Sequence, residues 1–114
     1  MTERPTPAAA SAIPMGSGEL AAALRDPDPF VRVDALGRAE GNARAFELIG
    51  SALSDDYPLV RREAVRALAR IGGASAARAL LQVSAHDLAA EVREEAVTAL
   101  ARMLRVRSAT GSDA

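Results

Sequence analysis

The sequence lacks cysteine, lysine and tryptophan, and only 3% of its 114 residues are aromatic. Without cysteine, the chain has neither a disulfide framework nor a thiolate metal site. Hydrophobic residues still make up 49% of the chain, and alanine, leucine and valine dominate them. Because alanine combines the highest helix propensity with a small side chain, this composition favours closely packed helices over a broad sheet.

A long apolar run and an excess of charge of one sign are also missing. The net charge is −1, so no overall field draws the protein to nucleic acid or to an anionic membrane. No apolar stretch approaches the ~20 residues that span a bilayer. The N-terminal stretch has no sustained apolar core of the kind found in signal peptides. These absences predict a cytoplasmic protein without a membrane partner.

Proline punctuates the N-terminal stretch. Pro5, Pro7 and Pro14 each remove a backbone donor and push the preceding residue out of the helical region. Residues 1–17 are therefore expected to form a disordered tail, and residues 108–114 a second, shorter one. Residues 18–107 remain as a single folded domain.

The sequence does contain a motif that occurs three times. The stretches are DPDPFVRVDALGRAEG from Asp26, DDYPLVRREAVRALARIG from Asp55 and DLAAEVREEAVTALARML from Asp87. In each, an aspartate is followed after four residues by Val-Arg, then by one residue, an acid and an alanine. The units are spaced by 29 and 32 residues. A repeat of this length indicates one supersecondary unit used several times.

Each unit is expected to be a helix, a turn and a second helix. Apolar residues recur at helical spacing upstream of each motif. Pro29 and Pro58 stand where the second helix would begin, and Asp28 is placed to cap the first of these helices. Gly41 and the pair Gly72–Gly73 are expected to close helices in a left-handed conformation. The predicted units cover residues 18–41, 42–72 and 73–105.

The expected core runs along the second helices. One apolar stripe contains Val60, Ala64, Leu68 and Ile71, and its equivalent in the third unit contains Val92, Ala96, Leu100 and Met103. A single helix pair cannot bury such a face alone, so the units should stack.

A helix pair with an aspartate in its turn and an arginine six residues later resembles the HEAT repeat, in particular the short bacterial form known from phycobilin lyase-type proteins. The resemblance covers about residues 18–105 and implies an all-α fold, an α-solenoid of three helix pairs. It also implies a ladder of hydrogen bonds between neighbouring units, formed by Asp26, Arg32, Asp55, Arg61, Asp87 and Arg93. The first unit departs from the pattern, with Ala39 where Leu68 and Leu100 stand, as a terminal capping unit does.

No set of residues indicates catalysis, a cofactor or a metal. His86 is the only histidine and has no nucleophile signature around it. Asp55–Asp56 is a carboxylate pair, but Asp55 is already the repeat aspartate. Gly72–Gly73 lacks the lysine and hydroxyl residues of a phosphate-binding loop. Structural explanations are therefore preferred for all three, and the chain is expected not to be an enzyme.

One surface feature has two interpretations. Arg62, Arg66 and Arg70 recur every four residues on the second helix of the middle unit, off the apolar stripe. Arg102 occupies the position of Arg70 in the third unit. They are either a solvated face with local acidic partners or a patch for an acidic peptide or other anionic ligand.

The favoured function is a non-enzymatic scaffold or adaptor that binds a protein or peptide through its concave helical face, an acidic partner being favoured if the arginines take part. An accessory subunit of a lyase or other modifying enzyme is the alternative. Nucleic-acid binding is disfavoured by the net charge and the few aromatic residues. The exposed apolar ends of a three-unit array also offer a route to self-association.

Overall fold

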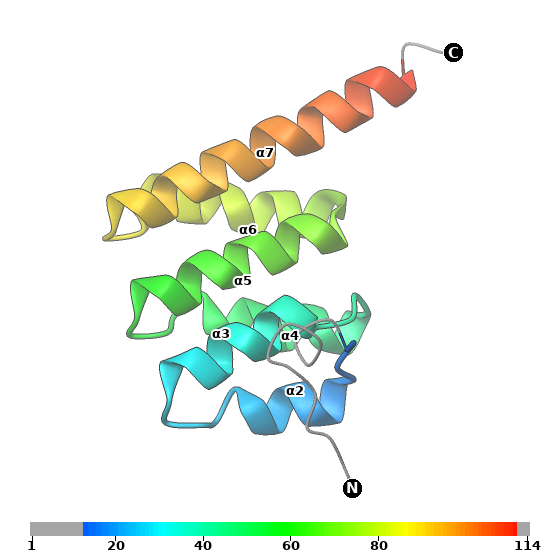
Figure 1. Ribbon diagram of the computed structural model, residues 1–114. Helices are drawn as coiled ribbons and strands as arrows, with labels where there is room; N and C mark the ends of the chain where they lie inside the picture. The colour runs from blue at the N-terminus through cyan, green and yellow to red at the C-terminus, as the bar shows by residue number, and fades with distance from the viewer. Residues whose placement is uncertain (1–12, 112–114) are drawn as a thin grey trace, which may run out of the picture.

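The computed structural model describes residues 13–111, which form six α-helices and no strand (Figure 1). The predicted all-α fold of three helix pairs is confirmed. The helices are α2 (Ser17–Ala23), α3 (Pro29–Arg38), α4 (Ala43–Ala52), α5 (Pro58–Ile71), α6 (Gly73–His86) and α7 (Ala90–Gly111). The first unit is α2–α3, the second α4–α5 and the third α6–α7.

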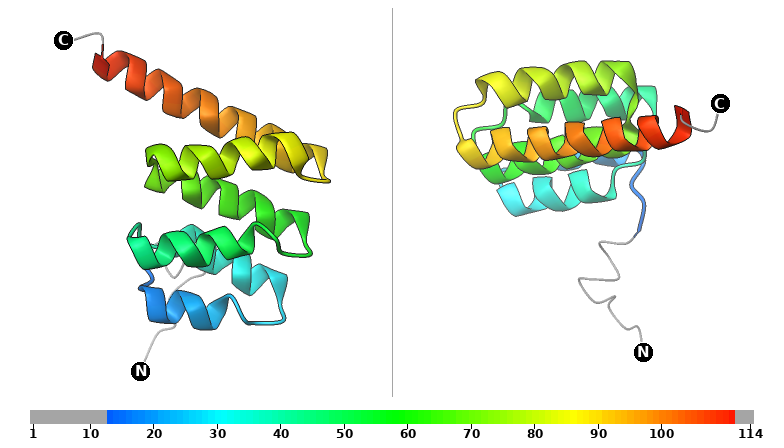
Figure 2. Two further views of the ribbon diagram at one scale, coloured as in Figure 1. Left: turned by 180° about the vertical axis from the view of Figure 1, so that it is seen from behind. Right: turned by 90° about the horizontal axis from the view of Figure 1, so that it is seen from above.

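The three units stack so that the helices form two layers, one of α2, α4 and α6 and the other of α3, α5 and α7 (Figure 2). Within the second layer, α5 packs closely against both α3 and α7. In the first layer α2 and α4 contact less closely, and α4 and α6 hardly touch. Because α3, α5 and α7 pack more closely than α2, α4 and α6, the stack of units curves toward them, and they line its inner side. Their solvent side is called the concave face below.

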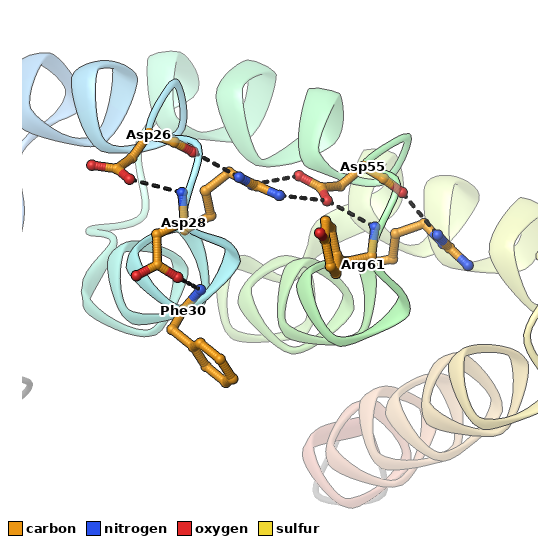
Figure 3. A network of polar contacts seen from close by, with 7 residues as sticks. Asp26, Asp28, Phe30, Asp55 and Arg61 are labelled. Carbon is orange, nitrogen blue, oxygen red and sulfur yellow. Dashed lines mark hydrogen bonds and ion pairs between the residues drawn. The ribbon is translucent and has the colours of Figure 1, made fainter.

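The predicted starts of the second helices are confirmed. Pro29 and Pro58 are the first residues of α3 and α5, where the missing N–H leaves no intrahelical bond unmade. Asp28 caps α3, because its carboxylate accepts a hydrogen bond from the Phe30 N–H at 2.9 Å (Figure 3).

The predicted glycine stops are confirmed in part at one site, where the helix ends with a positive φ but without the left-handed helical ψ, and are wrong at the other. Gly72 has φ 72° and Gly73 has φ 90°, and Gly72 alone separates α5 from α6. Gly41 has no positive φ, since α3 already ends at Arg38 and Ala39 is extended. Close packing gives a different reason for this glycine. A Cβ at Gly41 would lie 3.3 Å from Cγ1 of Ile71.

The core runs without a break through all three units. Leu68, in the C-terminal half of α5, is fully buried, as the apolar stripe predicts. Ile71, Leu100 and Met103 are only partly buried and pack against the edge of this core. The largest fully buried side chains are Leu20, Leu36, Ile49, Val60, Val65, Leu68, Leu80 and Val92.

Both predicted tail boundaries need correction. The segment before α2 is held against the end of α3, because the Met15 N–H donates to the Arg38 carbonyl at 2.8 Å and Met15 is buried. Arg38 also donates from Nε to the Ile13 carbonyl at 2.8 Å. At the other end, α7 continues through Gly111, past the expected boundary at Arg107. The rest of the two expected tails, residues 1–12 and 112–114, lies outside the described residues.

Within the described range, none of the helices combines the length and the apolar character needed to cross a membrane.

Candidate functional site

The predicted aspartate–arginine ladder is present between neighbouring units. Figure 3 shows the part of it at the turns of Asp26 and Asp55. Arg32 of the first unit reaches Asp55 of the second with two hydrogen bonds, from Nε at 2.8 Å and from Nη2 at 3.1 Å. Arg61 of the second unit reaches Asp87 of the third in the same way, at 2.9 Å and 3.2 Å. Such paired bonds are geometrically specific, so they fix the register in which the units stack.

Each ladder residue also stabilises the turn of its own unit. The Asp55 carboxylate accepts from the Tyr57 N–H at 3.0 Å, and Asp87 accepts from the Ala89 N–H at 2.9 Å. The third guanidinium nitrogen of Arg61 donates to the Asp55 carbonyl at 2.8 Å. One guanidinium therefore joins two turns, its own and that of the following unit.

In the ladder, a paired carboxylate and guanidinium stabilise each other in their charged forms. Burial by itself raises the pKa of Asp87, but hydrogen bonds from Arg61 and from the Ala89 N–H outweigh it, so the pKa lies below its ordinary value. The hydrogen bond to Asp55 is the largest effect on Arg32 and raises the pKa of its guanidinium. The ion-paired state is thus the stable one at neutral pH.

The ladder has one open position at each end of the described residues. Asp26 accepts the Asp28 N–H at 2.9 Å, but its carboxylate receives no arginine within residues 13–111. Arg93 donates from Nη1 to the Asp87 carbonyl at 2.6 Å, and its Nε and Nη2 have no acceptor in the same range. The three units thus form two complete rungs and leave complementary charges at the two ends.

Comparison with known proteins agrees with this geometry. A family model described as HEAT repeats matches residues 17–101. The chain belongs to the HEAT-repeat family. No curated protein and no solved structure matches the chain. The HEAT match covers all three units, so the ladder and the stacked helix pairs belong to one repeat architecture.

The arginines predicted to bind a partner lie on the concave face of this HEAT array, but three of them already have intramolecular partners. Arg62 Nε lies 3.4 Å from Glu95, and Arg66 contacts the same carboxylate at 3.1 Å. Arg70 donates to the Leu36 carbonyl of the first unit at 2.7 Å.

These contacts cross from one unit to the next, so the arginines support the stack as the ladder does. The hydrogen bond to Glu95 is the largest effect on Arg66 and raises the pKa of its guanidinium. Arg102 is exposed on α7, and no hydrogen bond or ion pair holds it within the described part of the chain.

Sequence reasoning missed the apolar part of the concave face. Leu59 stands three residues before Arg62 on α5, which places both on one helix face, and Leu59 is exposed. Phe30 is the equivalent residue of α3 and is 68% exposed. Figure 3 shows its ring directed away from the polar network. The sequence did contain a signal for this surface, because Phe30 and Leu59 are the residues directly before the Val of the first two motifs.

The other residues considered from sequence lie in a turn or at a helix end. Asp55 is held by Arg32 in the ladder, while Asp56 beside it is exposed, and His86 is an exposed residue at the end of α6. No group of three metal-ligating side chains occurs among residues 13–111. Two hollows on this part of the surface, of about 460 Å³ and 270 Å³, are open grooves.

Proposed function

We propose that this HEAT-repeat protein is a non-enzymatic scaffold that binds a protein or peptide partner through its concave face. The observation that carries the proposal is the exposure of Phe30 and Leu59 beside the charged cluster of α5 and α7. Interfaces typically combine exposed aromatic or aliphatic anchors with arginine and a polar rim. The concave face has both components, on helices held rigidly by the ladder.

The arginines can contribute to binding without leaving their internal partners. A guanidinium carries five N–H donors, of which Arg66 uses one toward Glu95. Arg62 is ion-paired with Glu95 through Nε at 3.4 Å, and this buried nitrogen makes no hydrogen bond. About two-fifths of each side chain is still exposed, 38% for Arg62 and 42% for Arg66. An acidic side chain of a partner therefore has donors to accept from, while Glu95 keeps the guanidinium groups oriented.

The two alternatives receive less support from the surface. A subunit of a phycobilin lyase-type or other modifying enzyme needs an enclosed apolar cavity, whereas the hollows at α7 and between α2 and α4 are open grooves. Nucleic-acid binding needs a continuous strip of basic side chains. On the concave face, Glu63 and Glu95 are interleaved with the arginines.

The test begins by locating a partner on the surface. A photo-crosslinking residue is placed at Phe30, on the concave face, or at Leu81, an exposed residue of α6 in the other layer. Each full-length variant is irradiated in native cell extract, and the captured proteins are identified by mass spectrometry. We expect a protein captured at position 30 and not at position 81.

The captured partner is then purified and titrated against wild type, Phe30→Ser, Leu59→Ser and the control Leu81→Ser. Loss of an interface anchor typically lowers affinity by roughly tenfold or more. We expect that loss for the first two variants, unchanged affinity for Leu81→Ser, and weaker wild-type binding at higher salt. Equal affinities for all four proteins would exclude the concave face as the binding surface.

A further inference from the structure

The N-terminal end of the array exposes a residue that is buried in the other units. Val31, Val60 and Val92 occupy the same position of the motif. Val60 and Val92 are fully buried, whereas Val31 is 37% exposed. The second and third units each have a preceding unit, whereas the first has none within residues 13–111. Val31 therefore lies on a surface that a preceding unit would cover.

The C-terminal end shows the reverse pattern. Leu36, Val65 and Val97 are equivalent, and only Val97 is exposed, at 56%. Val65 follows Arg61 by four residues, so it shares the helix face from which Arg61 reaches the next unit. Val97 likewise follows Arg93, whose Nε and Nη2 have no acceptor among the described residues.

The exposed face of α7 is hollowed where a further unit would lie. An open groove of about 460 Å³ is lined by Ala90, Arg93, Glu94, Val97 and Thr98. Their equivalents on α5 include Arg61, which pairs with Asp87 of the third unit, and Val65, which is fully buried. In Arg93 and Val97 the groove therefore repeats the ladder part of a repeat-to-repeat interface, without the carboxylate that completes it.

We propose that the occupant of this groove is a second copy of the chain, stacked end to end so that its Asp26 pairs with Arg93. Asp26 is the one ladder aspartate that receives no arginine within residues 13–111. Its carboxylate can complete the rung that Arg93 leaves open, in the geometry of the two internal rungs. Val31 and Val97 then become buried across the junction, as their equivalents are within each copy.

The contact joins two different surfaces, so it is heterologous and repeats from copy to copy. The acid that would approach Glu94 and Thr98 across the junction is Asp34 of the second copy. Asp34 is already ion-paired with Arg38 at 3.0 Å, which reduces its repulsion of Glu94. The proposal concerns the ends of the array and does not depend on the function proposed for the concave face.

The test is a charge exchange followed by sedimentation velocity over a range from micromolar to millimolar protein. Wild type is expected to form species larger than the monomer as concentration rises. Arg93→Asp and Asp26→Arg should each weaken association by about tenfold or more, because each places like charges at the junction. An equimolar mixture of the two variants should associate again, since every junction between unlike copies then pairs opposite charges.

Arg102→Asp is the matched control, because it makes the same charge change on the opposite side of α7 and should associate as wild type does. Val97→Asn tests the apolar part at an exposed position where folding is spared, and should also weaken association. Circular dichroism checks that every variant remains helical. A wild type that stays monomeric throughout the range, or a mixture that associates no better than its components, would overturn the proposal.

Discussion

At the scale of single residues, the ladder arginine Arg61 connects two neighbouring units. Arg61 makes three hydrogen bonds, two to the next unit and one to its own turn. It is largely buried together with Asp87, so neither charge can be compensated by water if its partner is removed. Arg93 makes only the bond to its own turn and therefore provides a natural comparison.

We expect Arg61→Ala to lower the free energy of unfolding by about 1–3 kcal/mol, because it leaves the Asp87 carboxylate unpaired. Arg93→Ala removes one hydrogen bond and leaves no carboxylate unpaired, so its effect should be smaller. Urea denaturation followed by circular dichroism measures both. An Arg93 effect equal to that of Arg61 would contradict the role assigned to the rung.

Asp87 should also make stability depend on pH. Its pKa is lowered in the folded protein, so its charged form favours folding. This contribution is fully present above the ordinary carboxyl pKa of about 3.9 and is lost as pH falls through the lower folded value.

Asp87→Asn should therefore be less stable than wild type at neutral pH, and the two should converge in acid. Asp56→Asn, at an exposed neighbour of the ladder, should follow the wild-type curve. Urea melts at a series of pH values provide the measurement. A constant difference between wild type and Asp87→Asn at all pH values would show that charge is not the cause.

At the scale of elements, the connection between α5 and α6 is the tightest in the fold. Gly72 has φ 72° and ψ −172°, a region that is essentially restricted to glycine. Because this one residue reverses the chain, it determines where the third unit begins relative to the second. Gly50 offers a contrast, since it lies inside α4 with nothing within 4 Å of a Cβ added there.

Gly72→Ala should destabilise the protein by about 1–3 kcal/mol through backbone strain. Gly50→Ala should stabilise it by about 0.4–1 kcal/mol, because alanine loses less backbone entropy in a helix. Thermal melts of the two variants test both signs in one experiment. A Gly72→Ala protein as stable as wild type would show that the connection can adopt another conformation.

At the scale of the whole molecule, the continuous core makes the three units depend on one another. Leu68 is fully buried in the helix that contacts both neighbouring units. A cavity there weakens packing on both sides of α5. The array should therefore unfold as one cooperative unit.

Leu68→Ala is expected to lower the free energy of unfolding by about 2–5 kcal/mol, the range for a buried leucine. Leu88→Ala makes the same chemical change at a residue that is 96% exposed and should alter stability by no more than about 0.5 kcal/mol. Denaturant melts with a single transition would give both values. A loss at Leu68 as small as that at Leu88 would contradict the assigned core.

The sequence by itself determined the units and their second helices, whereas the residues of the ladder were implied by the resemblance to the HEAT repeat. Local signals were sufficient, because Pro29, Pro58 and Asp28 act on the backbone beside them. The apolar stripe through Leu68 follows from helical spacing alone. Asp55, which accepts hydrogen bonds both from its own turn and from Arg32, is likewise a residue that the repeat motif identifies.

Only the tertiary structure decided what surrounds each exposed side chain. Spacing placed Arg62, Arg66 and Arg70 on one face, but Glu95 and the Leu36 carbonyl reach them from neighbouring units. Likewise, Val31 and Val97 match buried residues in the motif and are exposed because no further unit covers them in the described chain. Burial depends on which units are stacked together, so a pattern within one unit cannot reveal it.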